Sequence, residues 1–347
     1  MIYRVGVIGL GLMGDVHVRA FQGHAAFEVV AVADPNGAVC EAVAQAQGVA
    51  ARYASPHELI ARETLDILTI ATPPRYHAEL AIAGFARGCH VLCEKPMAMS
   101  AGEAQAMLQA ASASGKVHVL GHQSRFNPVR ARIRELVLAG YIGTPRHALY
   151  HHFAPGNTAT ARWSWWSSRE EGGGMLGEYA SHQIDLLRWY LGEIAAADGS
   201  VTTFGSARPD ETGRLRQVTS DDHAEVGLTM TDGAKVRIIV CAASGSRSGP
   251  RLELHGSAGS LALDAEDRLW GCRGAGGPEE LTVAETRPSL IGWAKNDTFT
   301  PAFQRLVEAL ALTLPEGRAP EAAADFADGL AIQHVLDAAR SGRSYRP

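Results

Sequence analysis

The sequence predicts a parallel α/β domain followed by an α+β domain with an open, mostly antiparallel sheet. The chain has 347 residues, more than the ~250–300 at which a single core usually stops growing, so two domains are expected. Strand-like and helix-like segments alternate strictly up to residue 121, which is typical of a parallel sheet covered by helices on both faces. Beyond that point, short strands are separated by turn residues, an antiparallel pattern. We therefore expect domains at 1–121 and 122–347.

The strands of the first domain are apolar runs without a polar face. They are expected at residues 3–8, 28–34, 65–72, 90–94 and 116–121. Because no face of these runs is polar, each strand should be buried on both sides.

Helical segments separate these strands. One of them starts at Ser55, which stands before Pro56 and Glu58 as an N-cap residue would. The other helices are expected at 12–23, 37–48, 77–88 and from Ser100 to about 114.

The second domain alternates less regularly. Several short strands are expected between 198 and 284, with polar surface loops at 205–220 and 272–280. Its other expected elements are helices at 128–139, 175–191, 297–313 and 321–341 and a strand at 146–153.

Charge and composition exclude several classes of protein. The net charge of −5 provides no basic surface for nucleic acid, and no apolar run is long enough to span a bilayer. The five cysteines form no CxxC pair and the fourteen histidines are scattered, so we expect neither a disulfide framework nor a metal site. A cytoplasmic protein with reduced cysteines fits these features best.

A glycine motif, Gly9-Leu10-Gly11-Leu12-Met13-Gly14, follows the first strand and opens the first helix. In this context the first glycine permits a tight turn, the second lets the backbone approach a pyrophosphate, and the third lets helix and strand pack closely. The helix N-terminus then offers free N–H groups to the phosphates. Glycines that serve only the turn are the alternative.

Asp34 ends the second strand, 20 residues after Gly14. A carboxylate there can accept hydrogen bonds from both adenosine ribose hydroxyls and would repel a 2′-phosphate. Because no Arg or Lys follows in Pro35-Asn36-Gly37, NAD(H) is favoured over NADP(H). Alternatively, Asp34 caps the next helix.

Lys95 follows Glu94 at the end of a parallel strand and precedes Pro96. Ligands bind at this edge of such sheets, and a lysine there can stabilise negative charge on a substrate oxygen. A lysine exposed at the surface is the alternative.

The segment from Gly172 to Asp185 carries a second chemical group. Glu178 and His182 are four residues apart, on one helix face, and Asp185 is three residues beyond His182. A histidine backed by a carboxylate is a suitable general base for a hydroxyl proton. A surface ion pair on the helix is the alternative.

Substrate contacts are harder to assign. Aromatic faces suit the C–H faces of a sugar ring, which points to Trp165 and its neighbours Trp163 and Trp166, although tryptophan clusters are usually core. Polar contacts are expected from Arg125, Asn127, His152, Tyr179 and Asp185.

Three segments together resemble the family of glucose–fructose oxidoreductases, inositol dehydrogenases and MocA-type proteins (Gfo/Idh/MocA). They are the glycine motif, the stretch 71–107 that contains Glu94-Lys95-Pro96, and the stretch 172–192. The resemblance covers nearly the whole chain. It implies an N-terminal Rossmann domain and a C-terminal domain whose open sheet often forms an oligomer interface, so a homodimer or homotetramer is expected.

The resemblance also implies residue roles. Lys95 matches the family's catalytic lysine and His182 its catalytic histidine, while Glu178 stands where many members have aspartate. The nicotinamide side would be bordered by Thr72, Pro73, His77, Glu94 and Gln123.

Three functions follow from these assignments. The first is oxidation of a secondary hydroxyl of a sugar, cyclitol or similar polyol, or reduction of the ketone. The second is a redox-neutral glycosidase, lyase or epimerase that keeps and cycles its NAD. The third is a non-catalytic NAD-binding regulator, against which the presence of both Lys95 and His182 argues.

Overall fold

The structure, a computed structural model, describes residues 2–155, 162–292, 297 and 299–347. Its internal contacts divide it into two compact units. The first unit comprises Met1–Asn127 and Thr286–Leu330, and the second comprises Pro128–Glu285 and Ala331–Pro347.

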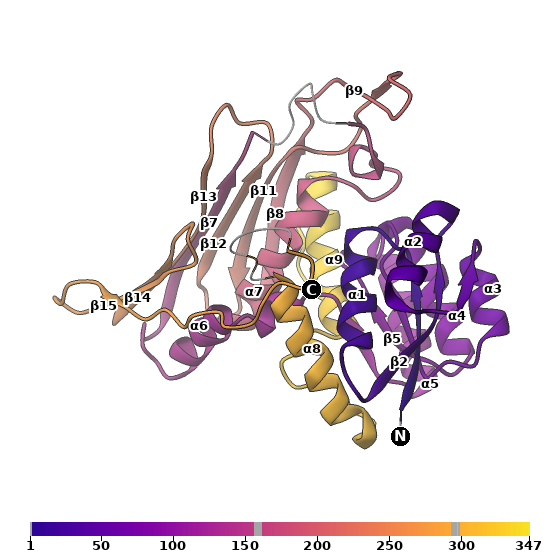
Figure 1. Cartoon of the computed structure of the whole chain (residues 1–347). Helices are drawn as coiled ribbons and strands as arrows, with labels where there is room; N and C mark the ends of the chain where they lie inside the picture. The colour runs from indigo at the N-terminus through magenta and orange to yellow at the C-terminus, as the bar shows by residue number, and fades with distance from the viewer. Residues whose placement is uncertain (1, 156–161, 293–296, 298) are drawn as a thin grey trace. The chain divides into compact units, whose positions relative to one another are not determined.

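A six-stranded parallel sheet forms the centre of the first unit (Figure 1). The strands lie in the order β3-β2-β1-β4-β5-β6, and every neighbouring pair is parallel. Because the order changes direction between β1 and β4, the carboxyl ends of these two strands border the crevice where open α/β sheets bind ligands. The strands are β1 (Tyr3–Ile8), β2 (Phe27–Ala33), β3 (Ala51–Tyr53), β4 (Ile67–Ile70), β5 (His90–Cys93) and β6 (His118–Leu120).

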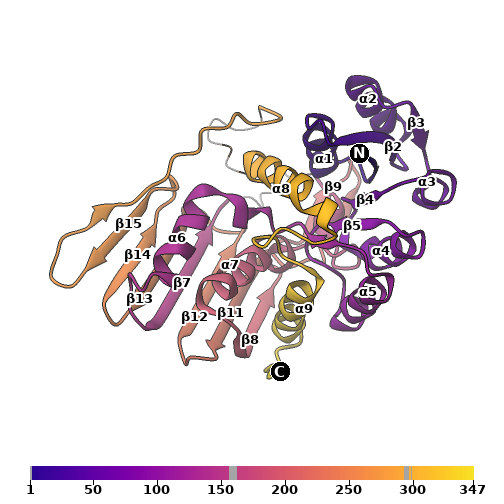
Figure 2. The same ribbon diagram turned by 90° about the horizontal axis from the view of Figure 1, so that it is seen from below.

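Helices cover both faces of this sheet (Figure 2). Helices α1 and α2 share one apolar core with α8, and α3, α4 and α5 share the other. Both predicted capping serines are confirmed, because Ser55 Oγ accepts the Glu58 N–H and Ser100 Oγ accepts the Glu103 N–H. The helices are α1 (Leu12–Gln22), α2 (Gly37–Gln47), α3 (Pro56–Arg62), α4 (His77–Ala86), α5 (Ala101–Ser114) and α8 (Phe299–Thr313), with 3-10 turns at Pro74–Tyr76, Gln123–Phe126 and Leu314–Glu316.

The division into units differs from the expected one at residues 122–127 and 286–330. Both segments were expected in the second domain and belong to the first unit. For residues 286–330 the reason is the apolar face of α8, where Phe303, Leu306 and Leu310 are buried in the core that α1 also lines. Residue 298, at the start of the expected helix, lies outside the described residues.

The second unit contains an eight-stranded mixed sheet in the order β16-β15-β14-β13-β7-β12-β11-β8. Only β7 and β12 pair in parallel among these described strands, so the sheet is mostly antiparallel, as predicted. The strands are β7 (Pro145–Phe153), β8 (Ile194–Thr202), β11 (His223–Met230), β12 (Lys235–Cys241), β13 (Ser248–Gly256), β14 (Gly259–Leu263), β15 (Leu269–Arg273) and β16 (Glu279–Glu280).

One face of this sheet is covered by α6 (Pro128–Leu138), α7 (Ser181–Leu191) and the later part of α9 (Phe326–Ser341) (Figure 2). A short 3-10 turn lies at Trp165–Ser167. Helix α9 begins at Phe326 rather than near residue 321, because Asp325 caps it by accepting the Ala327 and Asp328 N–H groups.

The polar stretch 205–220, which is predicted to be a surface loop, contains regular structure. It contains a two-stranded antiparallel sheet of β9 (Ala207–Pro209) and β10 (Leu215–Gln217). The turn between the strands is closed by Asp210, which accepts the Thr212 and Arg214 N–H groups. The prediction missed this hairpin because its strands are short and lack an apolar alternation.

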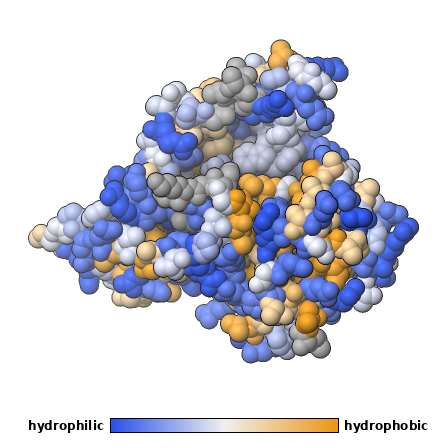
Figure 3. Space-filling model, in the orientation of Figure 1, coloured by the Kyte–Doolittle hydropathy of each residue, from blue (hydrophilic) through white to orange (hydrophobic). Residues whose placement is uncertain are grey.

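None of the helices in the described residues combines the length and the apolar composition that a membrane crossing requires. The face drawn in Figure 3 carries mainly hydrophilic residues, with apolar ones in smaller groups.

Candidate functional site

The glycine motif adopts the geometry that its spacing predicts. Gly9 has φ +82°, and a Cβ on it would lie 2.7 Å from the Ala71 carbonyl oxygen. A Cβ on Gly14 would lie 1.8 Å from the Gly9 oxygen, so α1 can approach β1 only without a side chain there. A Cβ on Gly11 would meet nothing within 4 Å. The open space lies therefore at the glycine expected to face a pyrophosphate.

Asp34 is held against the glycine loop. Its carboxylate accepts the Leu10 N–H at 2.7 Å and the Asn36 N–H at 2.8 Å. The cap of α2 is Asn36, whose side chain accepts from Ala38 and Val39. The alternative in which Asp34 caps that helix is therefore wrong, and its carboxylate lies at the loop.

Leu12 and Met13 of the glycine motif differ in the exposure of their side chains. Leu12 is 50% exposed at the first position of α1. Met13 packs against the core shared by α1, α2 and α8. Leu12 is the more exposed of these two side chains, and Met13 is partly buried.

His77 ties together two of the loops at the carboxyl edge of the sheet. Its ring lies 2.8 Å from the Thr72 carbonyl oxygen and 2.9 Å from the Pro96 carbonyl oxygen, and the side chain is wholly buried. Burial lowers the pKa of His77, although both carbonyls favour the protonated ring. His77 therefore holds the turn after β4 and the turn after Lys95 in place. Pro73 lies in the first of these turns and precedes the 3-10 turn.

Glu94 is a buried carboxylate with a histidine partner that was not predicted from the sequence. His17 of α1 approaches Glu94 with its Nε2 atom at 3.1 Å and approaches the Thr69 hydroxyl with Nδ1. Phe303 of α8 stacks on the His17 ring at 4.2 Å. Although burial alone would raise it, the hydrogen bond from His17 and the charge of Lys95 lower the pKa of Glu94.

Lys95 leaves β5 directly after this carboxylate and is 9% exposed. The Lys95 N–H donates to Glu94 Oε2 at 3.3 Å, and the peptide bond to Pro96 is cis. A Cβ on Gly121 would lie 2.8 Å from the Glu94 carboxylate, so the glycine after β6 leaves room for that group. The turn that carries Lys95 is thus anchored by backbone and side-chain contacts.

Buried polar atoms at this edge fit a dinucleotide. The Thr72 hydroxyl and both amide atoms of Gln123 have no hydrogen-bond partner among the described residues, and Gln123 is 0% exposed. Leaving such a group unpaired costs about 1–3 kcal/mol, and a bound ligand is one explanation for it. With the open space at Gly11 and the carboxylate of Asp34, these atoms match the hydroxyls, phosphates and carboxamide of NAD.

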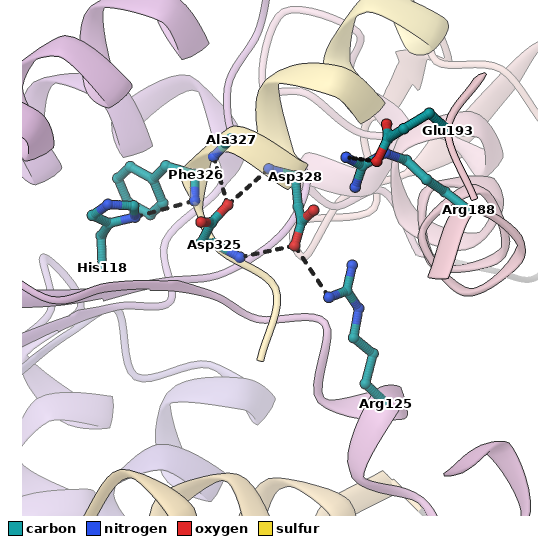
Figure 4. A network of polar contacts seen from close by, with 8 residues as sticks. All are labelled: His118, Arg125, Arg188, Glu193, Asp325, Phe326, Ala327 and Asp328. Atoms are coloured by element: carbon teal, nitrogen blue, oxygen red, sulfur yellow. Dashed lines mark hydrogen bonds and ion pairs between the residues drawn. The ribbon is translucent and has the colours of Figure 1, made fainter. Parts of the chain in front are cut away.

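Two residues predicted to contact substrate are buried in the first unit. Arg125 is 4% exposed and its guanidinium lies 3.1 Å from the Asp328 carboxylate at the start of α9 (Figure 4). The same figure shows Asp325 next to this pair. Asn127 is also 4% exposed, and its N–H donates to the Ser124 carbonyl. Arg125 therefore has a structural partner, and its predicted substrate contact stays a prediction.

In the second unit a π-helical turn, Leu176–Ala180, precedes α7. Such wide turns are rare and often occur at functional sites. Glu178 lies in the turn at 6% exposure, whereas Tyr179 is 39% exposed. His182 is half-buried in the first turn of α7. Asp185 is fully buried, which disfavours the substrate contact expected of it.

Asp221 anchors the π-helical turn by accepting two backbone hydrogen bonds. Its carboxylate accepts the Leu176 N–H at 2.7 Å, and its carbonyl accepts the Met175 N–H. A Cβ on Gly174 would lie 2.3 Å from the Asp221 carboxylate, which explains the third glycine of the Gly172–Gly174 run. Burial raises the pKa of Asp221.

A cavity of about 270 Å³ lies beside this turn, entirely within the second unit. The predicted substrate residues His152 and Tyr179 line it, and their rings stack at 5.3 Å. The lining tryptophan is Trp166, not the predicted Trp165, which packs edge-on against Trp166. Trp163 lines a different surface groove, where Arg216 stacks on its ring.

The cavity also contains arginines that sequence reasoning missed, Arg208 and Arg247. They come from β9 and from the loop before β13, and no motif surrounds either of them. His17 could have been found, because it lies three residues after Gly14 in the first helix. No group of three metal-ligating side chains occurs in the described part of the chain.

Comparison with known proteins identifies the family. One family model, an oxidoreductase family with an NAD-binding Rossmann fold, matches residues 3–122, and a GFO/IDH/MocA C-terminal domain matches residues 131–262. An uncharacterized oxidoreductase of Synechocystis sp. is 31% identical over 267 residues, which cover 76% of this chain and 72% of the relative. The chain belongs to the Gfo/Idh/MocA oxidoreductase family.

Other similar proteins match over almost their whole length. Inositol 2-dehydrogenase of Rhizobium meliloti is 28% identical over 344 residues, 98% of this chain and 96% of the relative. The crystal structure of an oxidoreductase domain protein from Kribbella flavida superposes with a TM-score of 0.87 at 28% identity and covers 99% of both chains. The predicted resemblance, fold class and NAD cofactor are confirmed, and this Gfo/Idh/MocA protein is an oxidoreductase.

Proposed function

We propose that this oxidoreductase oxidises a secondary hydroxyl of a sugar, cyclitol or similar polyol, or reduces the corresponding ketone. The observation that carries the proposal is the placement of Lys95. It follows the buried Glu94 at the carboxyl end of β5, in the unit that also holds the open glycine loop. The similarity to a protein named inositol 2-dehydrogenase supports a polyol as substrate.

In the proposed chemistry, the substrate loses a proton from its hydroxyl oxygen and a hydride from the carbon that bears it. His182 takes the proton of the substrate hydroxyl, and Lys95 donates a hydrogen bond to the same oxygen as negative charge develops. When NAD+ is bound, its nicotinamide accepts the hydride that leaves the substrate carbon. Reduction of a ketone is the reverse, with His182 returning the proton.

Neighbouring residues position these groups. Glu178 orients His182 from the π-helical turn four residues earlier.

The cofactor would be held by the first unit. Gly9, Gly11 and Gly14 leave the loop open to the phosphates, and Asp34 accepts hydrogen bonds from the ribose. Thr72 and Gln123 offer their unpaired polar atoms to the nicotinamide side. His77 and Glu94 act through the turns that they anchor.

The proposal is tested by a panel of polyols and sugars with NAD+ and NADP+, read by NADH absorbance. Lys95→Met should lower kcat by about 10²–10³-fold, the usual cost of removing a donor that stabilises a developing oxyanion, and leave NAD+ binding nearly intact. Lys116→Met, at the opposite end of the sheet before β6, is the matched control and should behave as the parent. Unchanged turnover in Lys95→Met would remove Lys95 from this role.

The same assay separates oxidation from redox-neutral cycling. NADH that accumulates with substrate indicates net oxidation, whereas product formed without added NAD+ and without accumulated NADH indicates cycling. The expected homodimer or homotetramer and the expected cytoplasmic location stay predictions.

A further inference from the structure

The cavity of the second unit contains positive charge that the described residues do not neutralise directly. Arg208 and Arg247 line it, and no ion pair joins either one to a carboxylate among the described residues. Arg208 donates to the Ser167 hydroxyl at 3.2 Å, a neutral partner. Unpaired guanidinium groups are the preferred partners of planar anions such as carboxylates and phosphates.

The two carboxylates at the cavity, Asp221 and Asp222, are turned toward the backbone. Asp221 accepts the Leu176 N–H, and the two oxygens of Asp222 accept the Phe204 and Gly205 N–H groups at 2.8 and 2.7 Å. They are therefore used as structural acceptors and leave the arginines to a ligand.

Positive charge also prevails around these carboxylates. Arg340 and Arg169 act electrostatically on Asp221, and Asp222 acts on Arg208. Asp337 pairs with Arg340 at 3.8 Å. With Arg247 and His152 both on the cavity wall, four guanidinium groups share this neighbourhood with three carboxylates. An anion entering the cavity would meet a net attraction.

A polar atom and aromatic faces complete the cavity wall. His152 is 7% exposed, and its Nδ1 atom has no hydrogen-bond partner in the described part of the chain. Tyr179 stacks on the His152 ring, and Trp166 meets the Tyr179 ring edge-on at 6.3 Å. Aromatic faces suit the C–H faces of a sugar ring, and an imidazole nitrogen suits a ring hydroxyl.

We propose that this cavity binds the anionic group of an acidic sugar, a sugar acid or a sugar phosphate, with Arg208 and Arg247 on the anion and His152 on a hydroxyl. This inference rests on the proposed function, because it assigns the acidic group of the proposed sugar substrate to this cavity. A cavity of about 270 Å³ is near the lower limit of the ~300–1,000 Å³ usual for small-molecule pockets, so it suits a monosaccharide rather than a nucleotide sugar.

Binding is measured first, by calorimetry on the full chain with NADH in place of NAD+, so that no probe hydroxyl can be oxidised. The probes are D-glucuronate, D-glucose 6-phosphate and D-glucose, which share a ring and differ in charge. We expect at least one acidic probe to bind about tenfold or more tightly than D-glucose. A carboxylate preference or a phosphate preference then identifies the source of the anion, and equal affinity for all three probes overturns the proposal.

Variants connect the preference to the cavity. Arg247→Gln lies at an exposed position, so its fold should persist, and it should reduce the preference for the acidic probe about tenfold. Arg208→Gln should do the same. Arg237→Gln, on the exposed side of β12 and paired with Asp198, is the matched control and should retain the preference. A preference that survives in both cavity variants places the anion elsewhere and overturns the proposal.

The failure of the proposed function would be recognised separately. If no sugar is oxidised by the parent but D-glucuronate binding depends on Arg247, the anion site stands and the catalytic proposal falls. If neutral polyols are oxidised through Lys95 and no acidic probe binds better, the catalytic proposal stands and the anion site falls.

Discussion

The two units each bury a carboxylate, and the two carboxylates behave in opposite ways. Glu94 in the first unit and Asp221 in the second are 4% and 8% exposed. Burial opposes the charge of both, but the pKa of Glu94 is lowered and that of Asp221 is raised. Glu94 has a histidine ring at 3.1 Å and a lysine as its neighbour, whereas Asp221 has a backbone N–H and more distant arginines. Close partners rather than burial decide in which direction the pKa of each carboxylate moves.

The difference extends to how each region is built. In the first unit, backbone atoms of the glycine loop define the open space, and a Cβ on Gly9 or Gly14 would clash with other backbone atoms. In the second unit, side chains from separate strands and loops surround a cavity. A substitution should therefore affect folding most where backbones touch and binding most where side chains line a space.

The largest expected effect is that of Gly14→Ala. Its Cβ would lie 1.8 Å from the Gly9 oxygen, a backbone atom that cannot give way alone. We expect a loss of about 3 kcal/mol in the free energy of unfolding, the upper end for overpacking. Gly11→Ala is the matched control for folding, because its Cβ meets open space and its φ is −65°. Gly11→Ala should unfold like the parent and bind NAD+ at least tenfold more weakly. Equal stability of the two variants in urea titrations would contradict the geometry.

Glu94→Gln tests the first carboxylate. Its lowered pKa means that ionised Glu94 adds stability above its unfolded pKa of about 4.3, and that this stability is lost as the pH falls through the lower folded pKa. We expect the variant to lose about 2 kcal/mol at pH 7, within the range for hydrogen bonds to charged groups. Urea unfolding at pH 7 and near pH 3 should show this loss shrinking in acid. A loss that grows in acid would refute the assigned direction.

Gln123→Leu tests the unpaired amide. Because the amide has no partner among the described residues, replacing it with an apolar side chain should leave the stability of the NAD-free protein unchanged or slightly higher. NAD+ binding should weaken about tenfold, or about 1.4 kcal/mol. Gln45→Leu, exposed on α2, is the control for the substitution itself. Undiminished NAD+ affinity in Gln123→Leu would show that the amide does not contact the cofactor.

Asp221→Asn tests the second carboxylate and should have the smallest effect. The raised pKa means that Asp221 contributes its full stability below its unfolded pKa of about 3.9 and loses it as the pH rises through the higher folded pKa. Asparagine can still accept the Leu176 N–H, so the variant should stay within about 1 kcal/mol of the parent at pH 7. Thermal unfolding from pH 4 to pH 7 should show the variant gaining relative to the parent, opposite to Glu94→Gln. A relative loss over that range would break the contrast between the two carboxylates.

Much of the first unit could be predicted because its signals are local. The alternation of helices and strands, the capping serines and the glycine loop all depend on residues within a few positions of one another. The π-helical turn could not be predicted, since the i, i+4 spacing of Glu178 and His182 is also that of an ordinary helix. The cavity residues Trp166, Arg208 and Arg247 could not be predicted either, because no periodicity links them.

The sequence by itself determined that a dinucleotide loop forms at Gly9–Gly14, because φ and Cβ clashes act between neighbours in the chain. The tertiary structure alone decided which groups surround each carboxylate: His17 and Glu94 are 77 residues apart, and Asp221 and Leu176 are 45 apart. The tertiary structure also decided which sheet α8 packs against, because an apolar helix face indicates that the face is buried but does not indicate its partner. Long-range packing and electrostatics depend on distances in space, which the order of residues does not contain.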